Sequence, residues 1–160
     1  MKFLLAIISL TFAASAALAV DFRWTLGYGQ GTLEANIANA NGSTININCP
    51  EGQTDTTPGM FIEVGRISHL HQRDETVTVQ IIVDGRNHSF SLKKIQFKAV
   101  TRMDKSQFRE FVHALASSKQ KSFVVEFPKY NTAETFSLLD ARKVIGLGKH
   151  SILKGCDEAE

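Results

Sequence analysis

The sequence is poor in the residue types that mark several specialised classes of protein. Three prolines and eleven glycines in 160 residues argue against a collagen-like or low-complexity chain. An excess of one charge is also missing, because 18 Lys and Arg against 16 Asp and Glu leave a formal charge of +2. So weak an overall charge predicts no nucleic acid as a partner and gives no strong field for anionic lipid. Beyond residue 19 no window approaches the roughly 18 apolar residues of a spanning helix, so we expect no membrane span in the mature chain.

Sequence motifs of known catalytic and cofactor sites are scarce as well. The chain has no GxSxG, HExxH or CxxC motif and no GxxxxGK[ST] phosphate loop. We therefore predict no cofactor and no catalytic residue, and favour a protein without enzymatic activity. One pattern keeps an alternative open: His69 and His71, two residues apart, would share a face of a strand. With a third ligand they could form the metal site of a small periplasmic hydrolase or metalloenzyme; otherwise they belong to a solvated loop.

The N-terminus carries the one long apolar run of the sequence. Lys2 is followed by the apolar stretch 3–12 and then by Ala17-Leu18-Ala19, a small-x-small cleavage site. These three parts, in this order, predict a secretory signal peptide over residues 1–19, cleaved after Ala19. The signal is short and rich in alanine, as in bacteria, so we expect a periplasmic or secreted protein. Residues 20–160 then form a single domain, because no repeat, linker or change of composition divides them.

Two cysteines, Cys49 and Cys156, are the whole cysteine content of the chain. An even number of cysteines in an exported protein favours a disulfide bond, and two cysteines allow only one intramolecular pairing. Closing a loop of about 100 residues would stabilise the fold by roughly 4–5 kcal/mol in the chain-entropy estimate. The alternatives are a reactive thiol or a metal pair, but neither cysteine has a neighbouring histidine.

The first half of the mature chain has the period-two pattern of β-strands. Residues 44–49 alternate between apolar and polar side chains after an Asn41-Gly42 turn signal. The clearest hairpin pairs residues 76–83 with residues 88–92 around Asp84-Gly85. Further short strands are expected at 22–28, 32–38, 60–64 and 95–99.

The second half changes to a helical period. Phe108, Phe111, Val112 and Leu115 predict an amphipathic helix over about 105–118, capped by Asp104 with Gln107 as its capping-box partner. A strand over 121–127 and a second helix from about residue 138 follow. The fold class is therefore α+β: an antiparallel β-sheet or small β-sandwich, with two packed α-helices in the C-terminal half and one disulfide.

Candidate binding residues are the amphipathic aromatics and one mixed-charge stretch. These possible interface residues are Trp24, Tyr28, Arg66, His69, His71 and Tyr130. For the three aromatic residues ordinary core or rim packing is the more common explanation, and a solvated loop explains the mixed-charge stretch equally well. Together with export, small size and the absence of catalytic motifs, they favour a non-enzymatic binding protein that docks a protein partner, such as an inhibitor, an immunity-type protein or an envelope accessory protein. A small-ligand carrier, with a cavity between sheet and helices, is a further alternative.

Overall fold

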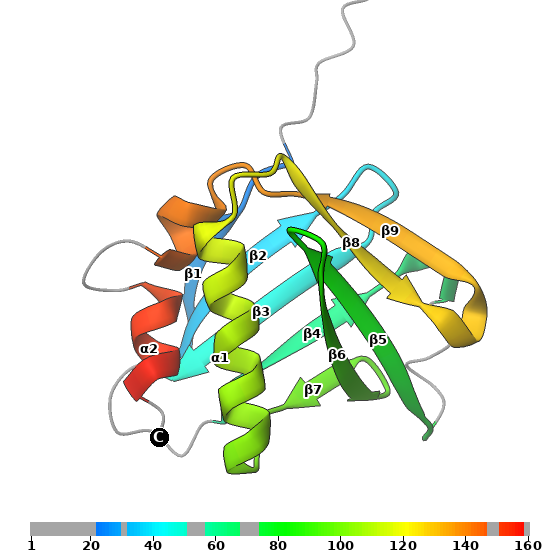
Figure 1. The fold of residues 1–160 in the computed structure, drawn as a ribbon, viewed down its shortest axis with the longest axis horizontal. Coiled ribbons are helices and arrows are strands. Elements are labelled where there is room, and N and C mark those ends of the chain that lie inside the picture. Colours follow the sequence, from blue (N-terminus) through cyan, green and yellow to red (C-terminus); the bar gives the residue numbers. More distant parts are fainter. Residues whose placement is uncertain (1–21, 30–31, 51–56, 68–73, 147–150, 159–160) are drawn as a thin grey trace, which may run out of the picture.

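A computed structural model describes residues 22–29, 32–50, 57–67, 74–146 and 151–158. Nine strands in these ranges form one sheet in the order β1-β2-β3-β4-β7-β6-β5-β8-β9 (Figure 1). Every neighbouring pair is antiparallel, as the sequence predicts. The strands are β1 (Thr25–Gly29), β2 (Thr32–Ala38), β3 (Thr44–Pro50), β4 (Gly59–Glu63), β5 (Thr76–Val83), β6 (Arg86–Lys93), β7 (Gln96–Lys98), β8 (Ser122–Phe127) and β9 (Thr132–Ser137).

The hairpins form where the sequence has residues that tolerate a positive φ. Asp84 and Gly85, with φ of 51° and 75°, turn the chain from β5 into β6, so that Val83 lies opposite Arg86. Two successive residues with positive φ are typical of the two-residue turn that suits the twist of a hairpin. Gly42, with φ of 75°, lies in the β2–β3 connection. Both hairpin predictions are confirmed.

The sheet curls around helix α1 (Arg102–Ser117), which lies against its concave face (Figure 1). In β2, β3, β5, β6 and β8 alternate residues face the core and are buried, as period-two side-chain alternation requires. Phe90 lies at the centre of this contact, with ring centroids 5.3 Å from Phe111 and 4.9 Å from Phe97. No helix among the described residues is long and apolar enough to cross a membrane.

The start of α1 differs by one turn from the sequence prediction. Thr101, not Asp104, is the N-cap: its hydroxyl accepts the Asp104 amide at 3.1 Å, and the Asp104 carboxylate accepts the Thr101 amide at 2.9 Å. Asp104 therefore occupies the third helical position of a capping box. Gln107, the expected partner, instead donates its side-chain amide to the carbonyl of Ser89 on β6. The earlier start adds Arg102 and Met103 to the helix.

The second predicted helix is also placed differently. Asp140 adopts a φ of 64°, which an α-helix does not accommodate, so no α-helix starts near residue 138. A single π-helical turn, Arg142–Gly146, follows, and the second α-helix is α2 (Ile152–Glu158). Gly146 lies so close to α1 that an added Cβ would be 2.9 Å from the Cβ of Ala116.

The predicted disulfide joins Cys49 at the end of β3 to Cys156 in α2, with the two Cα atoms 5.0 Å apart. Gly155 allows this close approach, because a Cβ there would lie 2.5 Å from the carbonyl oxygen of Pro50. The fully buried Ile152 adds an apolar contact to the same packing. The disulfide, the close approach at Gly155 and the burial of Ile152 thus hold the short helix α2 against β3 and β2.

Candidate functional site at the free edge of the sheet

The two edges of the sheet differ in how their main-chain groups are satisfied. At β9, the side-chain amide of Asn39 donates to the carbonyl of Thr135 at 3.3 Å, and the indole nitrogen of Trp24 donates to the carbonyl of Ser137 at 3.0 Å. The amide of Trp24 then donates to the carbonyl of Leu139 at 3.0 Å. These bonds cover the β9 edge with residues from the other end of the sheet, which is one way proteins protect an edge strand.

The β1 edge has no such cover in the part of the chain that the structure describes. After Trp24 the strand pairs with β2 alone, from Thr25 opposite Asn36 to Gly29 opposite Thr32. Alternate amide and carbonyl groups of an edge strand point away from its single neighbour. Residues 25–29 therefore offer a short row of main-chain donors and acceptors to an added strand.

Two apolar side chains lie exposed on this same strand. Leu26 is 49% exposed and Tyr28 is 65% exposed. Their register partners on β2, Ala35 and Leu33, are buried, so Leu26 and Tyr28 continue the apolar inner face of the sheet beyond the packed core. We refer to Leu26, Tyr28 and the main chain of residues 25–29 as the β1 edge.

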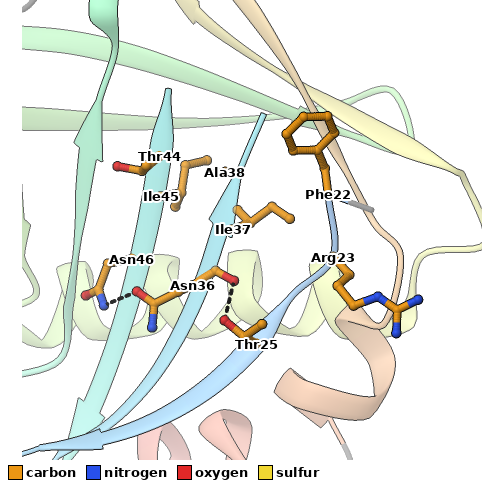
Figure 2. Close-up of a pocket in the computed structure, with 9 residues that line it drawn as sticks. All are labelled: Phe22, Arg23, Thr25, Asn36, Ile37, Ala38, Thr44, Ile45 and Asn46. Atoms are coloured by element: carbon orange, nitrogen blue, oxygen red, sulfur yellow. Dashed lines mark hydrogen bonds between the residues drawn. The ribbon is translucent and has the colours of Figure 1, made fainter. Parts of the chain in front are cut away.

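A hollow of about 450 Å³ lies beside the start of β1 (Figure 2). It exists because Trp24 bonds to the segment after β9, so that Phe22 and Arg23 diverge from β2. Its lining has an apolar part (Phe22, Ile37, Ala38, Ile45) and a polar part (Arg23, Thr25, Asn36, Thr44, Asn46).

Hydrogen bonds fix the polar side of the hollow. Asn46 donates its side-chain amide to the side-chain oxygen of Asn36 at 2.7 Å and to Glu34 at 3.4 Å. The hydroxyl of Thr25 donates to the carbonyl of Asn36 at 3.4 Å. Arg23 forms an ion pair with Asp140 at 3.4 Å, which holds the guanidinium near the rim. The hollow thus combines an apolar wall with ordered amides and a cation.

The structure separates the residues that the sequence proposed for an interface. Tyr28 lies exposed on β1, whereas Trp24 is 2% exposed and its ring stacks on Phe123 at 6.3 Å. Trp24 is therefore a core residue that joins the ends of the sheet, because its indole reaches the carbonyl of β9. Tyr130 lies at the β8–β9 connection, which Figure 1 places on the opposite side of the molecule from β1.

The remaining candidates form no cluster that the structure describes. The Tyr130 hydroxyl donates to Glu75, and Arg66 is exposed after β4. His69 and His71 lie outside the described residues, so their metal-site alternative stays a prediction. Within the described ranges, no three His, Cys, Asp or Glu side chains gather in a group that could hold a metal ion.

Sequence reasoning missed Leu26 and the hollow. Leu26 shares a face with Tyr28 and stands between Thr25 and Gly27, so period-two alternation was visible. Its exposure depends on β1 being an edge strand, which sequence periodicity does not show. The hollow depends on the pairing of Trp24 with residue 139, a contact between the two ends of the domain.

Two buried polar side chains lie away from the β1 edge. Glu134 on β9 is 1% exposed, and one of its carboxylate oxygens accepts the side-chain amides of Asn39 at 2.8 Å and Asn41 at 2.7 Å. These bonds tie β9 to the β2–β3 connection. His88 on β6 is 6% exposed beside Phe111. Burial lowers the pKa of His88, and Arg86 adds to the effect, while Glu110 opposes it.

Comparison with known proteins gives the chain a family. The sequence profile of the YfjT family matches residues 22–145, which is more than half of the chain. The chain belongs to the YfjT family. The matched range runs from the segment before β1 to the π-helical turn, so it includes the β1 edge, the hollow and α1, and it ends before α2 and Cys156.

Two Escherichia coli (strain K12) proteins are similar to this YfjT-family chain. "Uncharacterized protein YfjT" is 28% identical over 91 residues, which are 55% of this chain and 57% of that protein. "Uncharacterized protein YkfB" is 28% identical over 90 residues, which are 54% of this chain and 57% of that protein. The chain therefore spans little more than half the length of these relatives. No solved structure matches the chain.

Proposed function

We propose that this YfjT-family protein is an exported, non-enzymatic binding protein that docks an extended segment of a protein partner along the β1 edge. The observation that carries the proposal is the contrast between the two edges of the sheet. The carbonyls of Thr135 and Ser137 on β9 are bonded by Asn39 and Trp24, whereas β1 has only β2 as a described neighbour and displays Leu26 and Tyr28.

Strand addition explains why these features occur together. An extended peptide beside an edge strand forms main-chain hydrogen bonds, which supply affinity, and alternate side-chain contacts, which supply specificity. Tyr28 has the amphipathic ring that is over-represented among residues that dominate binding energy at interfaces. Five strand residues are enough for a short recognition segment.

The proposed export agrees with a binding protein whose fold is held together by a disulfide. The N-terminal signal pattern is in the part of the chain that the structure does not describe, so periplasmic or secreted localisation belongs to the proposal. The disulfide between Cys49 and Cys156 fits an oxidising compartment. A rigid scaffold of this kind presents a fixed edge at low entropic cost on binding.

Photocrosslinking tests the β1 edge directly. A photoreactive phenylalanine analogue replaces Tyr28 in the exported protein, and a matched analogue replaces Ala133, which is exposed on β9 at the other edge of the sheet. We expect one discrete adduct with an envelope protein from position 28 and none from position 133. Competition by unlabelled wild-type protein should remove the adduct, whereas competitor carrying Leu26→Ser and Tyr28→Ser should not. Equal adducts from both positions, or equal competition by the variant, would refute the proposal.

The hollow beside Phe22 favours one second candidate, a carrier of a small amphipathic ligand. Its volume of about 450 Å³ falls within the range of small-molecule sites, and its lining pairs apolar side chains with ordered amides. Native mass spectrometry of the protein taken from its producing cells should then show a bound small molecule that Asn36→Ala releases. A single apo mass for the freshly isolated protein would remove this candidate. The metalloenzyme alternative with His69 and His71 is tested by elemental analysis of the same sample.

A further inference from the structure

The two most exposed large apolar side chains among the described residues lie three positions apart at the junction between β7 and α1. Val100 is 69% exposed and Met103 is 79% exposed. Neither contributes to the β1 edge, since β7 is separated from β1 by three strands in the sheet. Met103 stands on the helix face opposite the buried residues Phe108 and Val112, so it projects outward from the first turn.

Positive charge is concentrated around this apolar pair. The segment from residue 85 to residue 109, which lies between Asp84 and Glu110, carries seven Lys and Arg and a single acidic residue, Asp104. The carboxylate of that acid is occupied by the amide of Thr101 in the capping box. One of the seven basic residues, Lys93, forms an ion pair with Asp74 at 3.3 Å. The remainder of the chain has more acidic than basic residues, so the overall charge of +2 conceals a strong separation of charge.

The cations line two hollows that flank the junction. One, of about 530 Å³, is lined by Asp74, Ser91, Lys93, Lys94, Gln96 and Lys98. The other, of about 480 Å³, is lined by Val100, Arg102, Lys105, Ser106 and Arg109. Lys98 and Arg102 are neighbours of the apolar pair along the chain, and both are exposed. Figure 1 shows the first turn of α1 and β7 at the same end of the molecule.

We propose that this surface, formed by Lys93, Lys94 and residues 98–109, binds the headgroup region of an anionic phospholipid bilayer. Val100 and Met103 enter the boundary between headgroups and acyl chains, and the surrounding lysines and arginines contact the phosphates. Elements that lie on a membrane combine protruding apolar side chains with basic residues around them in this way. We call the surface the β7–α1 tip.

A bilayer fits the β7–α1 tip better than a soluble polyanion does. Phosphate contacts with a nucleic acid require cations but gain nothing from a methionine that is 79% exposed at the centre of the patch. Val100 lines one of the two hollows, whereas Met103, the most exposed large apolar side chain among the described residues, lines neither and is not enclosed by a groove for a partner side chain. Association with the membrane is independent of the proposed docking at the β1 edge.

Vesicle cosedimentation tests this inference with the disulfide-bonded protein lacking residues 1–19. The probes are vesicles of phosphatidylcholine with about 30 mol% phosphatidylglycerol, at about 1 mM total lipid, and vesicles of pure phosphatidylcholine as the neutral control. We expect binding to the anionic vesicles only, weakening as salt is raised from about 50 to about 500 mM. Lys98→Gln with Arg102→Gln should reduce the partition coefficient about 25-fold, about fivefold for each charge. Val100→Ser with Met103→Ser should reduce it about tenfold or more.

A matched control removes two cations from the other end of α1. Lys119 and Lys121 are exposed in the α1–β8 connection, and Lys119→Gln with Lys121→Gln changes the net charge by the same amount. We expect this variant to keep vesicle binding within about twofold of wild type. Equal losses of vesicle binding in the two charge variants would show that binding depends only on the net charge of the protein. That result would overturn the assigned surface.

Two other outcomes would also overturn the proposal. One is no binding to anionic vesicles at low salt by a protein whose melting temperature is normal. The other is binding to heparin or duplex DNA that outcompetes the vesicles and is unchanged by Val100→Ser with Met103→Ser, which would identify a soluble polyanion as the partner. Melting curves of every variant separate these outcomes from misfolding, and the crosslink at position 28 reports independently on the β1 edge.

Discussion

Removal of the Cys49–Cys156 disulfide should lower stability without abolishing partner binding. The bond joins residues 107 positions apart, for which the chain-entropy estimate gives about 4.7 kcal/mol and typical measurements give about 2–4 kcal/mol. A domain of this size loses about 3–4 °C in melting temperature for each kcal/mol, so we expect a decrease of about 6–16 °C. Reduction of the wild type and the variant Cys49→Ala with Cys156→Ala should agree, because alanine adds no buried hydroxyl.

The structure also predicts where the loss begins. α2 has only seven residues, too few to persist as an isolated helix, and its attachment depends on Cys156 and on the buried Ile152. After reduction, hydrogen exchange should therefore quicken in α2 first, while β5 and β6 keep their protection.

Calorimetry and hydrogen exchange of the oxidised and reduced protein measure both effects. A melting temperature that changes by less than about 2 °C would contradict the entropic argument. Loss of crosslinking at position 28 in the reduced protein at 10 °C would contradict the separation of stability from binding. Two free thiols in the protein isolated from its producing cells would contradict the disulfide itself, and mass spectrometry tests this before any other assay.

Three further variants test the interior. Burial lowers the pKa of His88 in the folded protein, so on acidification the unfolded chain takes up a proton first. The free energy of unfolding should therefore fall as the pH drops below about 6.5. His88→Phe should reduce the difference between the free energies of unfolding that urea titrations give at pH 7.5 and at pH 5.0. Glu134→Ala should lower the free energy of unfolding by about 1–3 kcal/mol, because the buried amide of Asn39 loses an acceptor. Gly155→Ala should cost about 1–3 kcal/mol through the contact with Pro50, and a melting curve like that of wild type would contradict it.

Local signals predicted the hairpins, the amphipathic face of α1 and the disulfide. Each depends on nearby residues or on a simple count: the turn at Asp84-Gly85, the spacing of Phe108 and Phe111, and two cysteines after a predicted signal peptide. The sheet order was not predictable in the same way. β7 inserts between β4 and β6, a choice between alternative pairings of short strands that tertiary packing makes.

The candidate site was less accessible to sequence reasoning, and for two different reasons. Whether an edge is covered depends on the contact of Trp24 with Ser137, 113 residues away along the chain. The β7–α1 tip, by contrast, was visible in the sequence, because seven of the basic residues fall between positions 85 and 109. The net charge of the whole chain hid this cluster, because a net charge does not show where along the chain the charged residues lie.

The two proposed surfaces should be separable in one set of variants. Measured along the sheet, β1 and β7 are four strand spacings apart, about 19 Å, and distant substitutions without shared partners act independently. Leu26→Ser with Tyr28→Ser should therefore abolish the protein crosslink and leave vesicle binding unchanged, and Val100→Ser with Met103→Ser should do the reverse. The fourfold variant should lose both activities at an unchanged melting temperature, since all four side chains are exposed. If either pair weakened both activities, the two surfaces would act as one site, and the assignment of protein to β1 and lipid to the β7–α1 tip would be wrong.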